Sequence, residues 1–167
     1  MRYLAVLAAA GLALAAVPTL AQSKSNAVTA TAKDPAGIVR LLQQAGHTAS
    51  LTTDDWGDPK IEMQLAGRSG AILFYDCDET THDKCRSIQF SVGFDRAKPM
   101  PFSMLNDLVR SQRFMAMYLD DEGDPFMQWD IIMDEGIPSA VFLTAVKDFE
   151  GRVEYAANVI FAEERGQ

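Results

Sequence analysis

The sequence predicts an α+β fold in which an antiparallel sheet carries helices on one face. The segment 54–59, Asp-Asp-Trp-Gly-Asp-Pro, returns as 120–125, Asp-Asp-Glu-Gly-Asp-Pro. Each copy follows an amphipathic helical pattern and a strand-like run, and each precedes a second strand. The chain therefore looks like two pseudo-repeated helix–hairpin units, with the element order α-β-β-β-β-α-β-β-α.

The helical patterns have recognisable ends. Asp34 is an N-cap acceptor, Pro35 suits the first helical position, and Gly46 can end the first helix. A second helix of similar spacing lies midway along the chain. Apolar residues three and four positions apart predict a third helix over about 139–164. Gly151 interrupts that helix at a cost of about 1 kcal/mol relative to Ala, which leaves a bend or a break there open.

The strand patterns lie between these helices. Residues 60–65 and 87–94 alternate apolar and polar side chains, as half-buried antiparallel strands with one face in water do. Residues 71–75 are continuously apolar, which predicts a central strand covered on both faces. Residues 114–119 and 126–133 form the last two strands, one on each side of the second acidic segment.

The N-terminus has the features of an export signal. Arg2 precedes an uncharged run of mostly Ala and Leu, and small residues lead to a cleavage site after Ala21. A membrane span would need ~20 apolar residues, more than this run offers. We therefore expect a signal peptide over 1–21, a flexible leader over 22–33 and a single domain over 34–167. The product should be periplasmic or secreted, with no membrane span after cleavage.

The chain is acidic, with a formal net charge of −8. This charge argues against nucleic acid and against anionic membrane surfaces, which would repel it. It permits a basic partner or cations without requiring either.

The two cysteines, Cys77 and Cys85, belong to strand-like runs on either side of a short polar loop. A hairpin there would place them opposite each other, and a disulfide is expected in an oxidising compartment. A redox or metal pair is the alternative, but the C-x-x-C spacing is absent.

The paired acidic segments allow two interpretations. In the first, Asp caps each turn, Gly adopts a positive φ and Pro begins the outgoing strand. In the second, the carboxylates bind Ca²⁺, although an EF-hand would need alternate ligands, a Glu at position twelve and flanking helices. We favour turns and expect no metal or cofactor. The residues concerned are Asp54, Asp55, Gly57, Asp58, Pro59, Asp120, Asp121, Gly123, Asp124 and Pro125.

Catalytic signatures are scarce, so we expect no enzyme. The two histidines, His47 and His82, form no zinc-protease pattern, and Ser69 lacks the G-x-S-x-G context. An unrecognised hydrolase would need an ionisable cluster that only a structure shows. The methionines of the second hairpin belong to a core or to an adaptable binding face. Trp56 stands at a turn tip, where it either folds back or contacts a partner.

Several motifs together resemble the YbjN-type domain. They are Asp34-Pro35-x-Gly37-Ile38-Val39, Thr53-Asp54-Asp55-x-Gly57-Asp58-Pro59-Lys60-Ile61, Tyr75-x-Cys77 with Ile88-Gln89-Phe90, the helix end from Asn106 to Phe114, and the turn from Asp120 to Asp124. The resemblance covers nearly all of residues 34–165.

This resemblance implies a bacterial sensory transduction regulator with a fold similar to type III secretion chaperones. It also implies a small non-enzymatic domain that acts by contacting other proteins or a second copy of itself, with no catalytic residues to carry over. The export signal and the expected disulfide set this chain apart from cytoplasmic members. We therefore expect an exported interaction or regulatory module, with a periplasmic small-ligand or Ca²⁺ binder as the alternative.

Overall fold

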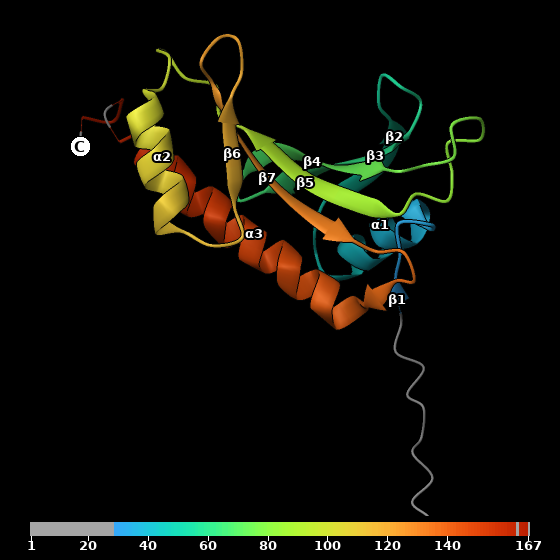
Figure 1. The fold of residues 1–167 in the computed structure, drawn as a ribbon. Helices are drawn as coiled ribbons and strands as arrows, with labels where there is room; N and C mark the ends of the chain where they lie inside the picture. Colours follow the sequence, from blue (N-terminus) through green and yellow to red (C-terminus); the bar gives the residue numbers. More distant parts are fainter. Residues whose placement is uncertain (1–28, 163, 167) are drawn as a thin grey trace, which may run out of the picture.

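A six-stranded antiparallel sheet is the centre of the molecule (Figure 1). The computed structural model describes residues 29–162 and 164–166, so the expected signal peptide over 1–21 lies outside the described residues. The spatial order is β2-β3-β4-β5-β7-β6. The strands are β2 (Ala49–Thr53), β3 (Pro59–Leu65), β4 (Arg68–Tyr75), β5 (Ser87–Gly93), β6 (Ala116–Leu119) and β7 (Pro125–Ile132).

Three helices complete the described fold: α1 (Pro35–Gln44), α2 (Phe102–Ser111) and α3 (Ser139–Ile160). In Figure 1, α1 and α3 lie beneath the sheet, and α2 stands beside the edge strand β6. The α+β class and the predicted order of the main elements are confirmed.

The core lies between the sheet and α3. Phe142 and Phe149 of α3 are fully buried and approach Phe90 of β5, with ring centroids 6.1 and 5.2 Å away. The helix runs through Gly151 without a break and ends at Ile160, a few residues before the predicted end near 164. Its long buried stripe explains this continuity, because tertiary packing outweighs the modest cost of one glycine.

The end of the expected leader is structured, contrary to the prediction for 22–33. Strand β1 (Thr29–Ala30) pairs antiparallel with β8 (Ile137–Pro138), immediately before α3. Ala30 and Ala32 are buried at 3% and 0% exposure. A two-residue strand has no measurable periodicity, so the sequence pattern does not reveal it. Residues 22–28 lie outside the described part.

The central strand β4 has only one fully covered face. Ile72 and Phe74 are buried on the helix side, and the strand is central as predicted, between β3 and β5. Tyr75, at the end of the apolar run, is 42% exposed, and Ala71 and Leu73 are only partly buried. The expectation of cover on both faces was wrong, because α1 and α3 lie on the same side of the sheet (Figure 1).

The two pseudo-repeated hairpins occupy opposite edges of the sheet. β2 and β3 form one hairpin and β6 and β7 the other, each antiparallel. Because the strand direction alternates across the antiparallel sheet, the two turns lie at opposite strand ends. Both turns rise away from α3, above the helix-free face (Figure 1).

Candidate functional site

The two acidic turns have the same hydrogen bonds. The Asp54 N–H donates to the Asp58 carbonyl over 2.9 Å, and the Asp120 N–H donates to the Asp124 carbonyl over 3.0 Å. In the first turn the Asp54 Oδ1 accepts from the backbone N–H groups of Trp56 and Asp58, both at 2.9 Å.

In the second turn the Asp120 Oδ1 accepts in the same way from Glu122 at 3.0 Å and from Asp124 at 2.9 Å. Gly57 and Gly123 have φ values of +96° and +83°, which side chains other than hydrogen disfavour. Pro59 and Pro125 are the first residues of β3 and β7. The carboxylates thus satisfy the N–H groups of their own turns, as the turn interpretation requires.

These turns give the Ca²⁺ interpretation no support. Across residues 29–162 and 164–166, no group of three or more His, Cys, Asp or Glu side chains is placed to hold a metal ion. Asp55 and Asp121 lie at exposed positions of the two turns.

The loop between β4 and β5 is closed by the predicted disulfide between Cys77 and Cys85. Inside it, Asp78 Oδ1 accepts from the N–H groups of Thr81 and Thr80, both at 3.0 Å. These backbone bonds hold the pKa of Asp78 below its ordinary value. His82 Nδ1 lies 2.8 Å from Asp58 Oδ1, so the loop contacts the first acidic turn.

Trp56 does not fold back onto the sheet. Its side chain is 84% exposed at the tip of the β2–β3 hairpin. That tip rises on the side of the sheet opposite α3 (Figure 1). A partner on the helix-free face would therefore be within reach of this large apolar side chain.

The helix-free face of the sheet, here called the open face, contains a hollow of about 530 Å³. Its floor consists of small residues on the two middle strands, Ser69 and Ala71 of β4 and Ser91 and Gly93 of β5. Side chains of the two neighbouring strands, β3 and β7, flank this floor. They are Lys60, Glu62 and Gln64 on β3 and Phe126 on β7. We call this hollow the central trough.

Aromatic rings form the β7 side of the central trough. Phe126 stacks on Tyr118 of β6 with ring centroids 5.3 Å apart, and Tyr118 is 45% exposed. An ideal Cβ on Gly93 would lie 2.9 Å from the Phe126 ring. Glycine at this position therefore allows the ring to lie over the floor of the trough.

Polar groups close the other end of the open face. The Tyr75 hydroxyl donates to Gln89 Oε1 over 3.3 Å, and Gln89 Nε2 donates to Asp130 Oδ1 over 2.9 Å. The pKa of Tyr75 is raised, first by burial and then by the charges of Asp130 and Asp54 and by Tyr118. The carboxylates that contribute to this shift, Asp130 and Asp54, come from the two edge hairpins.

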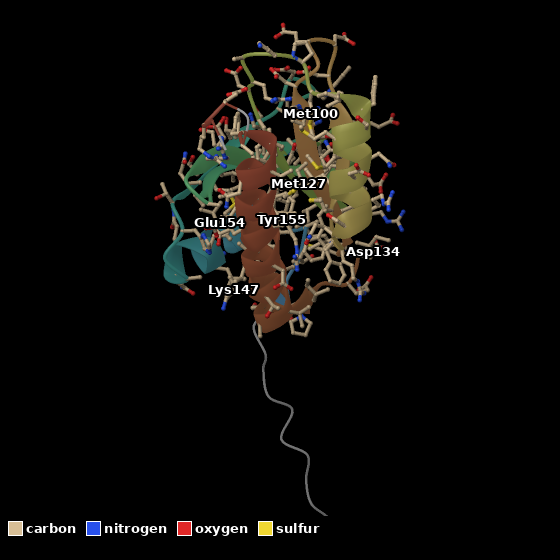
Figure 2. All side chains as sticks on the ribbon, turned by 90° about the vertical axis from the view of Figure 1, so that its left-hand side faces the viewer. Met100, Met127, Asp134, Lys147, Glu154 and Tyr155 are labelled. Carbon is tan, nitrogen blue, oxygen red and sulfur yellow. A yellow bond between two sulfur atoms is a disulfide. The ribbon has the colours of Figure 1, made fainter. Side chains whose placement is uncertain are left out.

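A second hollow, of about 570 Å³, lies between α2 and α3 and is lined in part by Met104, Leu108 and Tyr155. Figure 2 looks onto this side, with the two helices next to each other and Tyr155 labelled. The methionines do not form an exposed face. Met127 and Met133 are 0% and 1% exposed, and Met115 and Met117 are partly buried against the core, so the interpretation as a Met-rich binding face was wrong and the core interpretation holds.

Both histidines pair with carboxylates that do not line the trough. His47 Nδ1 lies 3.6 Å from Glu150, and His82 contacts Asp58. Neither histidine lines the trough, so no imidazole is placed there to activate Ser69 or Ser91.

Sequence reasoning located the turns, the disulfide and Trp56 but missed the central trough. The alternation in β3 and β5 does mark Glu62, Gln64 and Ser91 as outward residues. The apolar run of β4 concealed Ala71, and only strand pairing reveals that the small residues adjoin.

A family model described as "YbjN: Putative bacterial sensory transduction regulator" matches residues 34–159. The chain belongs to the YbjN family. The match includes the whole sheet, both acidic turns and nearly all of α3. No curated protein matched the chain in a sequence search. Among the described residues of this YbjN domain and its flanks, no helix is both long and apolar enough to span a bilayer.

Proposed function

We propose that this YbjN-family chain is an exported, non-enzymatic interaction module that holds a protein partner on the open face of its sheet. The observation that carries the proposal is the unequal cover of the sheet. Helices bury one face, and the other presents the central trough with the exposed rings of Tyr75 and Tyr118. An antiparallel sheet with a largely polar outer face is stable in water, so the face is accessible to a partner.

The rim of the open face adds a second contact. Trp56, 84% exposed on the first hairpin, is a large apolar side chain that nothing in the described part of the fold covers. Tryptophan is enriched among the residues that dominate protein interfaces. A partner seated on the trough would contact it at the edge.

Export is supported by the charge and hydropathy pattern of residues 1–21 and by the Cys77–Cys85 disulfide, since such bonds persist in oxidising compartments. The regulatory part of the proposal is supported by the family description. Fusion of residues 1–21 to a reporter that matures only outside the cytoplasm tests export. We expect an active reporter, and a reporter retained in the cytoplasm would refute export.

Photo-crosslinking tests the interaction. A photoreactive phenylalanine replaces Trp56 or the outward residue Gln128 of β7, and a control variant carries it at Thr144, exposed on α3. We expect adducts with another protein from the two open-face positions and not from Thr144. Adding Ala71→Arg to the open-face variants should abolish the adducts, whereas adding Thr144→Arg should not.

The same experiment tests self-association, because adducts between two copies of the chain would identify a homodimer on this face. Light scattering of the purified chain then gives its oligomeric state. Adducts from Thr144 alone, or from no position, would overturn the proposal.

A further inference from the structure

We propose that the segment held in the central trough is an extended, cationic stretch of the partner protein, with Lys or Arg side chains between the aromatic rings and the carboxylates of the open face. This inference rests on the proposed function and specifies the chemistry of the partner.

The charges of the open face favour a cation. Glu62 and Asp130 lie at outward positions of β3 and β7, and the acidic turns rise at both edges of the face. Among the described sheet strands β2 to β7, Lys60 is the only cation at an outward position, and it lies 3.3 Å from Glu62. The charges of Lys60 and Glu62 therefore cancel, and Asp130 and the acidic turns leave the face negative.

The rings of the open face suit a guanidinium or ammonium group. Tyr118 and Phe126 stack at one side of the trough, and Tyr75 is exposed at the other end of the open face. A cation above such a ring is attracted by its negative face, and a nearby carboxylate adds to that attraction. Burial is the first cause of the raised pKa of Tyr75, and the charges of Asp130 and Asp54 add to it.

The dimensions favour an extended chain. The floor occupies β4 and β5, and the flanking side chains stand on β3 and β7. Adjacent strands are ~4.8 Å apart, so the flanking backbones are separated by roughly 14 Å. A helix of ~10–12 Å diameter would nearly fill that width, whereas an extended segment fits within it. The small floor residues allow its backbone to lie close to the sheet.

A second copy of this chain is a poorer occupant. The formal net charge is −8, so two open faces would bring like charges together. Such juxtaposition is unfavourable and also slows association.

Binding of defined peptides to the full chain, as processed by its host, tests this inference. The probes are fluorescent peptides of alternating serine with arginine, with asparagine or with glutamate, measured by anisotropy at low and moderate salt. We expect the arginine peptide to bind the most tightly and to weaken with salt, because exposed charge pairs are screened.

Matched charge variants then locate the site. Glu62→Gln with Asp130→Asn removes two charges from the open face, and Asp148→Asn with Glu154→Gln removes two from the exposed side of α3, where Figure 2 labels Glu154. The first pair should weaken binding of the arginine peptide by roughly three- to tenfold, the effect of two exposed charge pairs. The second pair should change it by less than about twofold at moderate salt, since α3 lies on the opposite side of the sheet from the trough and exposed charges are screened over such a separation.

Tyr118→Leu separates ring attraction from net charge. The variant keeps the net charge and an apolar side chain. Binding of the arginine peptide should therefore weaken, by roughly two- to fivefold, only if its cation contacts the ring. Circular dichroism of every variant confirms that the fold persists.

The outcomes distinguish this inference from the proposed function. Equal effects of the two charge pairs, or equal binding of all three peptides, would overturn the cationic occupant. If open-face adducts still formed, the proposed function would stand. Adducts that join two copies of the chain would identify the occupant as a second copy and would overturn the inference in that way.

Discussion

The two acidic turns share their internal hydrogen bonds and differ in what holds them to the rest of the molecule. In the first, the Asp58 carboxylate contacts the His82 ring of the disulfide-closed loop at 2.8 Å. In the second, the equivalent Asp124 carboxylate accepts from the backbone N–H of Arg96 at 2.9 Å, and the Met100 N–H donates to the Gly123 carbonyl at 2.9 Å. One turn is thus secured through a titratable side chain, and the other through the main chain.

This difference shows that a repeated motif fixes a local conformation without fixing its surroundings. The Asp-x-x-Gly-Asp pattern supplies its own acceptors and its own positive φ, so both turns form in the same way. The anchoring segments come from parts of the chain that are not repeated. We expect the second turn to be the more rigid one, and the first to depend on the disulfide-closed loop.

The largest expected difference concerns the turn glycines. A Cβ on Gly123 would lie 2.6 Å from the Pro99 Cβ and 3.0 Å from its Cα, whereas one on Gly57 would lie 3.2 Å from the His82 ring. Both substitutions force a side chain into the left-handed region, at about 1–2 kcal/mol. Gly123→Ala adds a clash with the main chain, so we expect a total loss of about 2–4 kcal/mol against about 1–2 for Gly57→Ala. Urea unfolding measures both, and equal losses would contradict the difference in anchoring.

Removal of the disulfide should affect the two turns unequally. Opening the short loop with Cys77→Ser and Cys85→Ser is expected to reduce the free energy of unfolding by about 2–3 kcal/mol. It also frees the loop that carries His82. Amide hydrogen exchange should accelerate at Trp56 and Asp58 and stay unchanged at Glu122 and Asp124. Equal acceleration in both turns would show that the loop does not anchor the first turn.

The internal carboxylates of the turns should contribute equally. Asp54→Ala and Asp120→Ala each remove an acceptor of two backbone N–H groups. Because both turns are partly exposed, water can replace part of these bonds, and we expect each variant to lose about 1–2 kcal/mol. Chemical unfolding of the two variants side by side checks this. Values that differ by more than the cost of one hydrogen bond would show that the anchors alter the turns themselves.

The smallest expected effect is a pH dependence of the disulfide-closed loop. Hydrogen bonds from Thr81 and Thr80 lower the folded-state pKa of Asp78 below 3.8, so the carboxylate favours folding above that value. This contribution is lost as the pH falls through the lowered pKa. Asp78→Asn should therefore flatten the decline in stability below about pH 4. Thermal unfolding across this pH range is the measurement.

Local chemistry explains why much of the fold could be predicted. The N-cap at Asp34, the two hairpins and the disulfide depend on residues close together in the sequence, and the structure contains all of them. Turns and helix caps do not depend on contacts between distant segments, so they can be predicted from the sequence most directly.

The remaining features depend on contacts between distant segments. The apolar run of β4 gave no sign that Leu73 and Tyr75 would lie on the helix-free side, because that depends on where α1 and α3 pack. The pairing of Thr29–Ala30 with Ile137–Pro138 joins segments without any periodic pattern. The central trough likewise exists only because strand register places small residues of β4 and β5 side by side.

The pairing of β1 with β8 also limits when the N-terminal strand can join the fold. Whether the chain emerges from a ribosome or from a translocation pore, Thr29–Ala30 appear first and have no strand partner until Ile137–Pro138 follow β7. Ala30 therefore reaches its final burial only once β8 and α3 are in place beside β1. A nascent or truncated chain that stops short of β8 keeps an unpaired segment at Thr29–Ala30. Such a segment is accessible to proteases.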